Sequence, residues 1–188
     1  MASKRVAVIG ASGYGGLQTL RLLQGHPGLE VSFLGGERSS GKRWSELTPF
    51  LPLPGDPVVQ APDPDAIAAA ADLAVLSLPN GLASRLVPPL LERGVKVVDL
   101  SADYRYGSLQ QWREVYASEA RDFPRSDDAL CAEAVYGLVE WEQERIAAAR
   151  LVAAPGCFPT ASLLALTPLL KQGLIETAGI VKIGRAHV

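Results

Sequence analysis

A short apolar strand that runs straight into a glycine-rich turn is the feature that most constrains this chain. The strand predicted at 5–9 contains the apolar run VAVI at 6–9, residues 10–16 read GASGYGG, and a helical run over 17–24 follows. In a doubly wound α/β sheet, such a unit places the pyrophosphate of a dinucleotide on the N-terminus of the helix. A structural turn in another α/β domain stays as the alternative, because the spacing is G-x-x-G-x-x-G. The predicted cofactor contacts are Gly10, Ser12, Gly13, Tyr14, Gly15 and Gly16.

Each of the three spaced glycines has its own predicted task. Gly10 permits the tight turn, Gly13 lets the backbone approach the phosphates, and Gly16 brings the helix close to the strand. The amides and partial positive charge of the helix N-terminus then meet the anion.

Strand-like and helix-like segments alternate along the rest of the chain. Strands are predicted at 29–34, 73–78, 95–100, 151–153 and 180–183, and helices at 66–71, 82–93, 109–119, 140–150 and 160–171. Residues 35–62 and 121–131 are expected to be irregular. Because the strands are apolar throughout and alternate with helices, they indicate a parallel sheet with helices on both faces. The predicted fold class is α/β, a Rossmann-like doubly wound parallel sheet.

Composition excludes several classes of partner. The net charge is −2, so no basic surplus favours nucleic acid or a membrane surface. No apolar run approaches the roughly 20 residues that span a bilayer. The chain enters its first strand at once, without room for a signal peptide, so we expect a cytoplasmic protein. Its two cysteines, Cys131 and Cys157, form neither a metal nor a disulfide pattern, and no metal site is predicted.

The end of the second predicted strand favours NADP over NAD. An NADP site needs cations and hydroxyls around the 2′-phosphate, and Arg38, Ser39, Ser40 and Lys42 supply them. Glu37 argues for NAD, and an ordinary solvated loop is the other interpretation. After the strand at 73–78, the backbone of Leu78 and Pro79 is predicted to line the cofactor.

Cys157 is the candidate nucleophile. It lies in PGCFPT, residues 155–160, after a short strand and directly before the apolar helix 160–171. A helix N-terminus stabilises a thiolate, which is the reactive form of cysteine. A small buried cysteine is the equally weighted alternative from position alone. Cys131 has no comparable setting and is predicted to be structural.

Four segments resemble the N-acetyl-γ-glutamyl-phosphate reductases of arginine biosynthesis. They are GASGYGG at 10–16, DLSADYR at 99–105, VYGL at 135–138 and PGCFPT at 155–160, and the resemblance runs from about residue 5 to about residue 181. It implies that the Cys157 thiolate attacks the acyl phosphate of N-acetylglutamyl 5-phosphate, releasing phosphate and forming a thioester. Hydride from NADPH then gives N-acetylglutamate 5-semialdehyde. The family commonly has a histidine where this chain has Asn80, which puts any imidazole contact there in doubt.

Ser101 and Arg105 follow the strand at 95–100 and are weaker candidates for contacts to the substrate or its phosphate. For Arg105, a structural salt bridge to a neighbour such as Asp99 or Asp103 is the favoured alternative.

For the whole chain, two other functions stay open. One is an aspartate-semialdehyde or other phosphorylating semialdehyde dehydrogenase, and the second is a non-catalytic NADP-binding module.

The resemblance also implies a domain division. Residues 1–154 would form the NADP-binding domain, and residues 155–188 the truncated start of an α+β substrate domain. The family's catalytic histidine would lie beyond this chain. Residues 182–188 do not resemble the family's continuation, and we expect them to be a foreign tail or the result of a truncation. We therefore expect an apolar patch on the helix at 160–171, little or no activity of the chain alone, and a homo-oligomer for the complete enzyme.

Overall fold

The computed structural model describes residues 3–116, 125 and 127–181. The chain forms two compact units, Met1–Ala154 and Pro155–Val188. No helix among the described residues is long and apolar enough to cross a membrane.

The first unit is built on a six-stranded, entirely parallel sheet with the strand order β2-β1-β3-β4-β6-β5. Its strands are β1 (Lys4–Ile9), β2 (Leu29–Gly35), β3 (Leu73–Leu76), β4 (Lys96–Asp99), β5 (Val135–Tyr136) and β6 (Leu151–Ala153). Its helices are α1 (Tyr14–Leu23), α2 (Trp44–Leu47), α3 (Pro64–Ala70), α4 (Ala83–Glu92), α5 (Leu109–Val115), α7 (Asp128–Glu133) and α8 (Val139–Ala148). The predicted α/β class and parallel sheet are confirmed.

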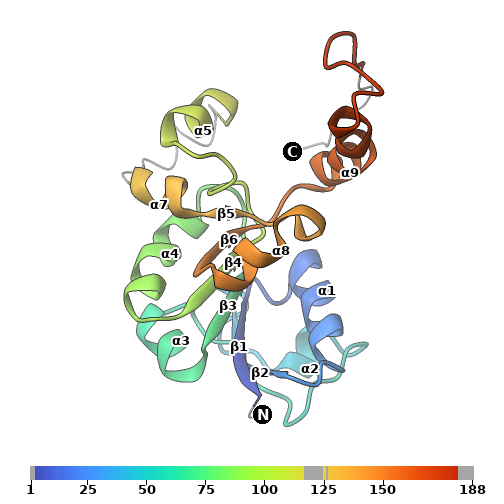
Figure 1. Ribbon diagram of the computed structural model, residues 1–188. Helices are drawn as coiled ribbons and strands as arrows, with labels where there is room; N and C mark the ends of the chain where they lie inside the picture. The colour runs from blue at the N-terminus through green and yellow to red at the C-terminus, as the bar shows by residue number, and fades with distance from the viewer. Residues whose placement is uncertain (1–2, 117–124, 126, 182–188) are drawn as a thin grey trace. The chain divides into compact units, whose positions relative to one another are not determined.

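Helices cover both faces of this sheet, α3 and α4 on one and α1 and α2 on the other (Figure 1). Successive residues of β1 supply both cores, because strand side chains alternate between faces. Ala7 and Ile9 join the core under α3 and α4. Val6 and Val8 join the core under α1 and α2, with Trp44 fully buried. This double burial explains why the inner stretches of the strands, such as residues 6–9 of β1, are apolar at successive positions.

The structure differs from the expected elements in the second half of this unit. Residues 128–133 form α7, although residues 121–131 were expected to be irregular, and residues 135–136 form the unpredicted edge strand β5. Within the irregular stretch 35–62, residues 44–47 form the single turn α2. The helix predicted at 109–119 spans Leu109–Val115, and positions 117–119 lie outside the described residues.

The second unit contains one long helix, α9 (Cys157–Lys171), which begins three residues before the predicted start. None of its residues is buried. Leu163 and Leu169 are 37% and 39% exposed, as expected for an apolar helix without a cover. The strand predicted at 180–183 is wrong for Ile180 and Val181, which are not in a strand. Its other two positions, and the tail expected at 182–188, lie outside the described residues.

Candidate functional site

The glycine turn joins β1 to α1 at the carboxyl edge of the sheet and contacts the chain after β3. Gly10 has φ +79°, and a Cβ atom there would lie 2.0 Å from the carbonyl oxygen of Ser77. At Gly16, a Cβ would lie 2.3 Å from the carbonyl oxygen of Gly10. Only glycine therefore fits at either position, and the predicted roles of Gly10 in the turn and Gly16 in helix packing are confirmed.

The N-terminus of α1 is open to an anion. Its N-cap residue is Gly13, no side chain caps the helix, and its first turn holds no acidic residue. Ser12, Gly13 and Tyr14 are exposed, and Tyr14 has 82% of its surface accessible. A helix start of this kind offers amide donors and a partial positive charge to a phosphate. The turn therefore fits the pyrophosphate of a dinucleotide.

The loop after β2 separates the predicted 2′-phosphate contacts into exposed and buried ones. Arg38, Ser40 and Lys42 are exposed. Ser39 is only 6% exposed, and a Cβ atom added at Gly36 would lie 2.3 Å from the Ser39 Oγ. Arg38 and Ser40 are therefore the better placed donors for a ligand, whereas Ser39 packs inside the loop.

The chain after β3 lies against the glycine turn. The Ser77 amide donates to the carbonyl of Ile9 at 2.8 Å, and a Cβ on Gly15 would lie 2.5 Å from Ser77 Oγ. Leu78 and Pro79, the two residues predicted to line the cofactor, come next along the chain. Ser77 was not predicted, although a hydroxyl directly after a buried strand is a signal for this edge.

The segment 99–105 is held together by its own side chains. The buried carboxylate of Asp99 accepts from Ser101 N at 2.9 Å and from Ser101 Oγ at 2.8 Å. The same Oγ accepts from Asp103 N at 3.2 Å. Ser101 is only 3% exposed, so its geometry favours a structural role over contact with a substrate. Burial raises the pKa of Asp99 to about 7, against the lowering effect of the Ser101 bonds.

Asp103 connects this segment to α4. Its carboxylate accepts from Gly81 N at 2.5 Å and Ser84 N at 3.1 Å, at the start of the helix. The N-cap residue of α4, Leu82, has no side chain that can do so. Asp103 thus satisfies amides of a helix 20 residues earlier in the chain, a role that spacing does not reveal. Burial raises its pKa.

Arg125 is the buried centre of a polar cluster that sequence reasoning missed. Its guanidinium pairs with Asp127 at 2.9 Å and donates to the Asp103 carbonyl at 2.6 Å. It also lies 4.7 Å from the ring centre of Tyr104, which donates to Asp127, and 4.8 Å from that of Trp112. Within the first unit, the cluster connects α5, through Trp112, to α7, through Cys131.

Arg105 makes no ion pair with Asp99 or Asp103, so the predicted salt bridge is wrong. Its Nε donates to the carbonyl of Ala154 at 2.8 Å, and an Nη donates to that of Leu100 at 2.9 Å. Arg105 thus ties the end of β6 to the loop after β4. These bonds favour a structural role for Arg105 over a contact with phosphate.

The two cysteines have opposite settings. Cys131 is buried in α7, with its Sγ 3.6 Å from an Arg125 nitrogen, and burial raises its pKa to about 11. Cys157 is exposed and is the first residue of α9. Thr160 Oγ1 donates to the carbonyl of Gly156 at 3.0 Å and does not cap an amide. An exposed thiol at a helix N-terminus suits a nucleophile, and a buried one does not.

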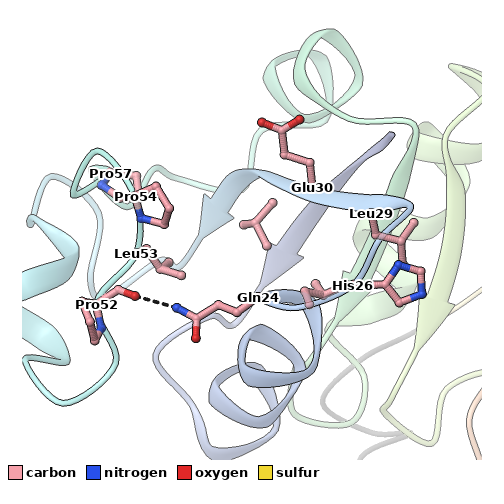
Figure 2. A pocket seen from close by; sticks show the side chains of 10 residues that line it. Gln24, His26, Leu29, Glu30, Pro52, Leu53, Pro54 and Pro57 are labelled. Atoms are coloured by element: carbon pink, nitrogen blue, oxygen red, sulfur yellow. Dashed lines mark hydrogen bonds between the residues drawn. The ribbon is translucent and has the colours of Figure 1, made fainter. Parts of the chain in front are cut away.

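One groove of the first unit lies away from these residues (Figure 2). It measures about 740 Å³ and runs between the end of α1, the start of β2 and residues 52–57. Gln24 donates to the Pro52 carbonyl across it at 2.6 Å. His26 lines it too, and its Nδ1 accepts from Gly28 N at 3.1 Å. None of the candidate residues borders this groove, and the part of the chain that the structure describes has no cluster of side chains suited to a metal ion.

Comparison with known proteins agrees with this geometry. N-acetyl-gamma-glutamyl-phosphate reductase from Synechococcus sp. (strain CC9605) is 72% identical over 177 residues, 94% of this chain and 50% of that protein. The protein of the same name from Prochlorococcus marinus (strain MIT 9313) is 68% identical over the same shares. The chain thus spans about half the length of the curated relatives it matches. The resemblance drawn from the four sequence segments is confirmed.

Solved structures support the fold alone. Aspartate semialdehyde dehydrogenase II from Vibrio cholerae, complexed with ASA, has a TM-score of 0.61 at 23% identity, over 90% of this chain and 47% of that one. Aspartate semialdehyde dehydrogenase with NADP from Candida albicans has a TM-score of 0.60 at 20% identity, over 91% and 48%. A family model described as "Semialdehyde dehydrogenase, NAD binding domain" matches residues 5–149. The chain therefore belongs to this family and carries a domain that binds a nicotinamide dinucleotide.

Proposed function

We propose that the complete protein is an NADPH-dependent reductase that converts N-acetylglutamyl 5-phosphate to N-acetylglutamate 5-semialdehyde and phosphate. The observation that carries the proposal is the 72% identity to a reductase of that name over 94% of this chain. The open glycine turn and the exposed Cys157 at a helix start are the parts that such a reaction needs. Homo-oligomeric assembly and a cytoplasmic location stay predictions.

Cys157 would perform the covalent chemistry. Its thiolate attacks the acyl carbon, the C–O bond to phosphate breaks, and an enzyme thioester forms. Bound NADPH would supply the hydride that reduces this thioester. Hydride addition leaves a tetrahedral alkoxide on the same carbon; the C–S bond of this alkoxide then breaks, which releases the aldehyde and returns the Cys157 thiolate. Sulfur suits both steps because it attacks well and leaves well.

NADP is the proposed form of the cofactor. Arg38 and Ser40 are exposed after β2, on the side of β1 where the adenosine half of a dinucleotide lies in this fold. A guanidinium and a hydroxyl there suit the 2′-phosphate. The exposed Glu37 is a neighbouring group of the wrong charge.

The test joins the 177 matching residues of this chain to the remaining half of the Synechococcus sp. (strain CC9605) relative. We expect phosphate-dependent reduction of NADP⁺ with N-acetylglutamate 5-semialdehyde. Cys157→Ser should lower this activity by about 10³-fold or more, because the nucleophile is lost. Cys131→Ser is the matched control and should keep most of it. Arg38→Ala should lower kcat/KM for NADP⁺ by about tenfold or more and change that for NAD⁺ little.

Two outcomes would contradict the proposal. A chimera that prefers aspartate 4-semialdehyde would favour the other semialdehyde dehydrogenase reaction. A Cys157→Ser variant with full activity would remove the thioester mechanism.

A further inference from the structure

Asn80 is the single asparagine of the chain, and it lies in the turn between β3 and α4. Its Oδ1 accepts a hydrogen bond from Ala102 N at 3.0 Å, which ties the loop after β3 to the loop after β4. This bond fixes which end of the amide faces Ala102. Within residues 3–116, 125 and 127–181, no acceptor takes a hydrogen bond from the other end, Nδ2.

The turn that carries Asn80 adjoins the predicted phosphate site. Ser77, three residues before Asn80, contacts Gly10 through its carbonyl and Gly15 through its hydroxyl. The loop that contains Asn80 therefore begins against the glycine turn itself.

Strand order gives the direction of a bound dinucleotide. β1 lies between β2 and β3, and ligands of open parallel sheets bind at the carboxyl ends of the strands. With the pyrophosphate on α1 and the adenosine half toward β2, the second nucleotide extends toward β3. It then meets residues 77–80.

We propose that Asn80 binds the nicotinamide half of the cofactor, its Nδ2 donating a hydrogen bond to an oxygen of that half while its Oδ1 stays on Ala102 N–H. This inference rests on the proposed NADP site and adds a specific contact to it. A side-chain amide suits the task because one group provides an acceptor for the loop and a donor for the ligand.

The single asparagine makes a direct test available. The full 188-residue chain, labelled with ¹⁵N only at asparagine, gives one pair of side-chain NH₂ signals in a ¹H–¹⁵N spectrum. NADP⁺ should shift this pair, because it carries the nicotinamide half. Adenosine 2′,5′-bisphosphate, which carries only the adenosine half, should leave the pair in place while it binds.

Affinity provides the second readout. Asn80→Ala should weaken NADP⁺ binding by about fivefold, the effect of one neutral hydrogen bond, and change adenosine 2′,5′-bisphosphate binding by less than about twofold. Asn80→His, which keeps one acceptor and one donor, should restore most of the NADP⁺ affinity. Gln143→Ala, on an exposed part of α8, is the matched control and should change neither affinity.

The outcomes separate this inference from the proposed function. If the chain binds both ligands and the Asn80 signals do not respond to NADP⁺, or respond equally to the bisphosphate, the inference is overturned alone. If the chain binds neither ligand, the NADP site and the inference are both overturned.

Discussion

Asp99 is a fully buried carboxylic acid of the segment 99–105, and its burial has a consequence for stability. It ends β4 at the carboxyl edge of the sheet, and only Ser101 donates to its carboxylate among the described residues. Burial raises its pKa to about 7, and the nearby charge of Asp103 adds to the rise. The folded protein thus keeps the Asp99 proton over a pH range in which the unfolded chain, with an aspartate pKa of about 3.9, has lost it.

The sign of the pH dependence follows from this difference. Because the native state binds more protons between about pH 4 and pH 7, Asp99 lowers the free energy of unfolding as the pH rises through that range. Three pKa units correspond to about 4 kcal/mol. Asp99→Asn mimics the protonated acid. Its free energy of unfolding minus that of the parent should therefore increase by about 4 kcal/mol as the pH rises from 4 to 8. Urea unfolding followed by tryptophan fluorescence measures the difference.

Glu144→Gln, on the exposed surface of α8, is the control for this measurement and should show no such trend. A constant difference between Asp99→Asn and the parent at every pH would show that Asp99 is ionised in the folded protein.

At the scale of elements, α4 depends on a carboxylate from a distant loop. Asp103→Ala would leave the amides of Gly81 and Ser84 without their acceptor inside the first unit. We expect a loss of about 2 to 4 kcal/mol in the free energy of unfolding, since unsatisfied buried donors cost about 1 to 3 kcal/mol each. The N-cap of α3 is the comparison, because Asp63 accepts from Ala66 N at 2.8 Å in an exposed setting.

Asp63→Ala should cost only about 1 kcal/mol, as water replaces the lost acceptor. Urea unfolding of both variants at one pH compares the two caps. Equal losses would mean that Asp103 contributes no more than an ordinary surface cap.

The difference between local and distant partners explains which elements and site residues can be predicted from the sequence. The strands buried on both faces and the turn at 10–16 follow from local patterns, because their apolar runs and glycines meet local requirements. The two-residue strand β5 and the six-residue helix α7 are too short to carry a period. Asp103 depends on partners 19 and 22 residues away, and one of the two partners of Arg105 is 49 residues away, so no local pattern contains these roles.

At the scale of the whole molecule, the two units differ in how their elements are stabilised. The strands of the first unit lie in two buried cores, whereas α9 in the second buries none of its residues. Most helices owe their stability to the packing of an apolar face and not to intrinsic propensity. Local opening is therefore expected to need far less free energy in α9 than in the sheet.

Hydrogen exchange measured by mass spectrometry checks this difference. Peptides from β1, β3 and β4 should exchange slowly, at rates set by global unfolding of the first unit, and peptides from α9 should exchange orders of magnitude faster. Free NADP⁺ at 100 times its Kd stabilises the unit that binds it by about 2.7 kcal/mol, which slows its globally protected amides by about 100-fold. Because the glycine turn lies wholly in Met1–Ala154, this slowing should appear in the sheet and be absent from α9. Protection of α9 that equals that of the sheet, or that rises with it on addition of NADP⁺, would show that the two units unfold as one.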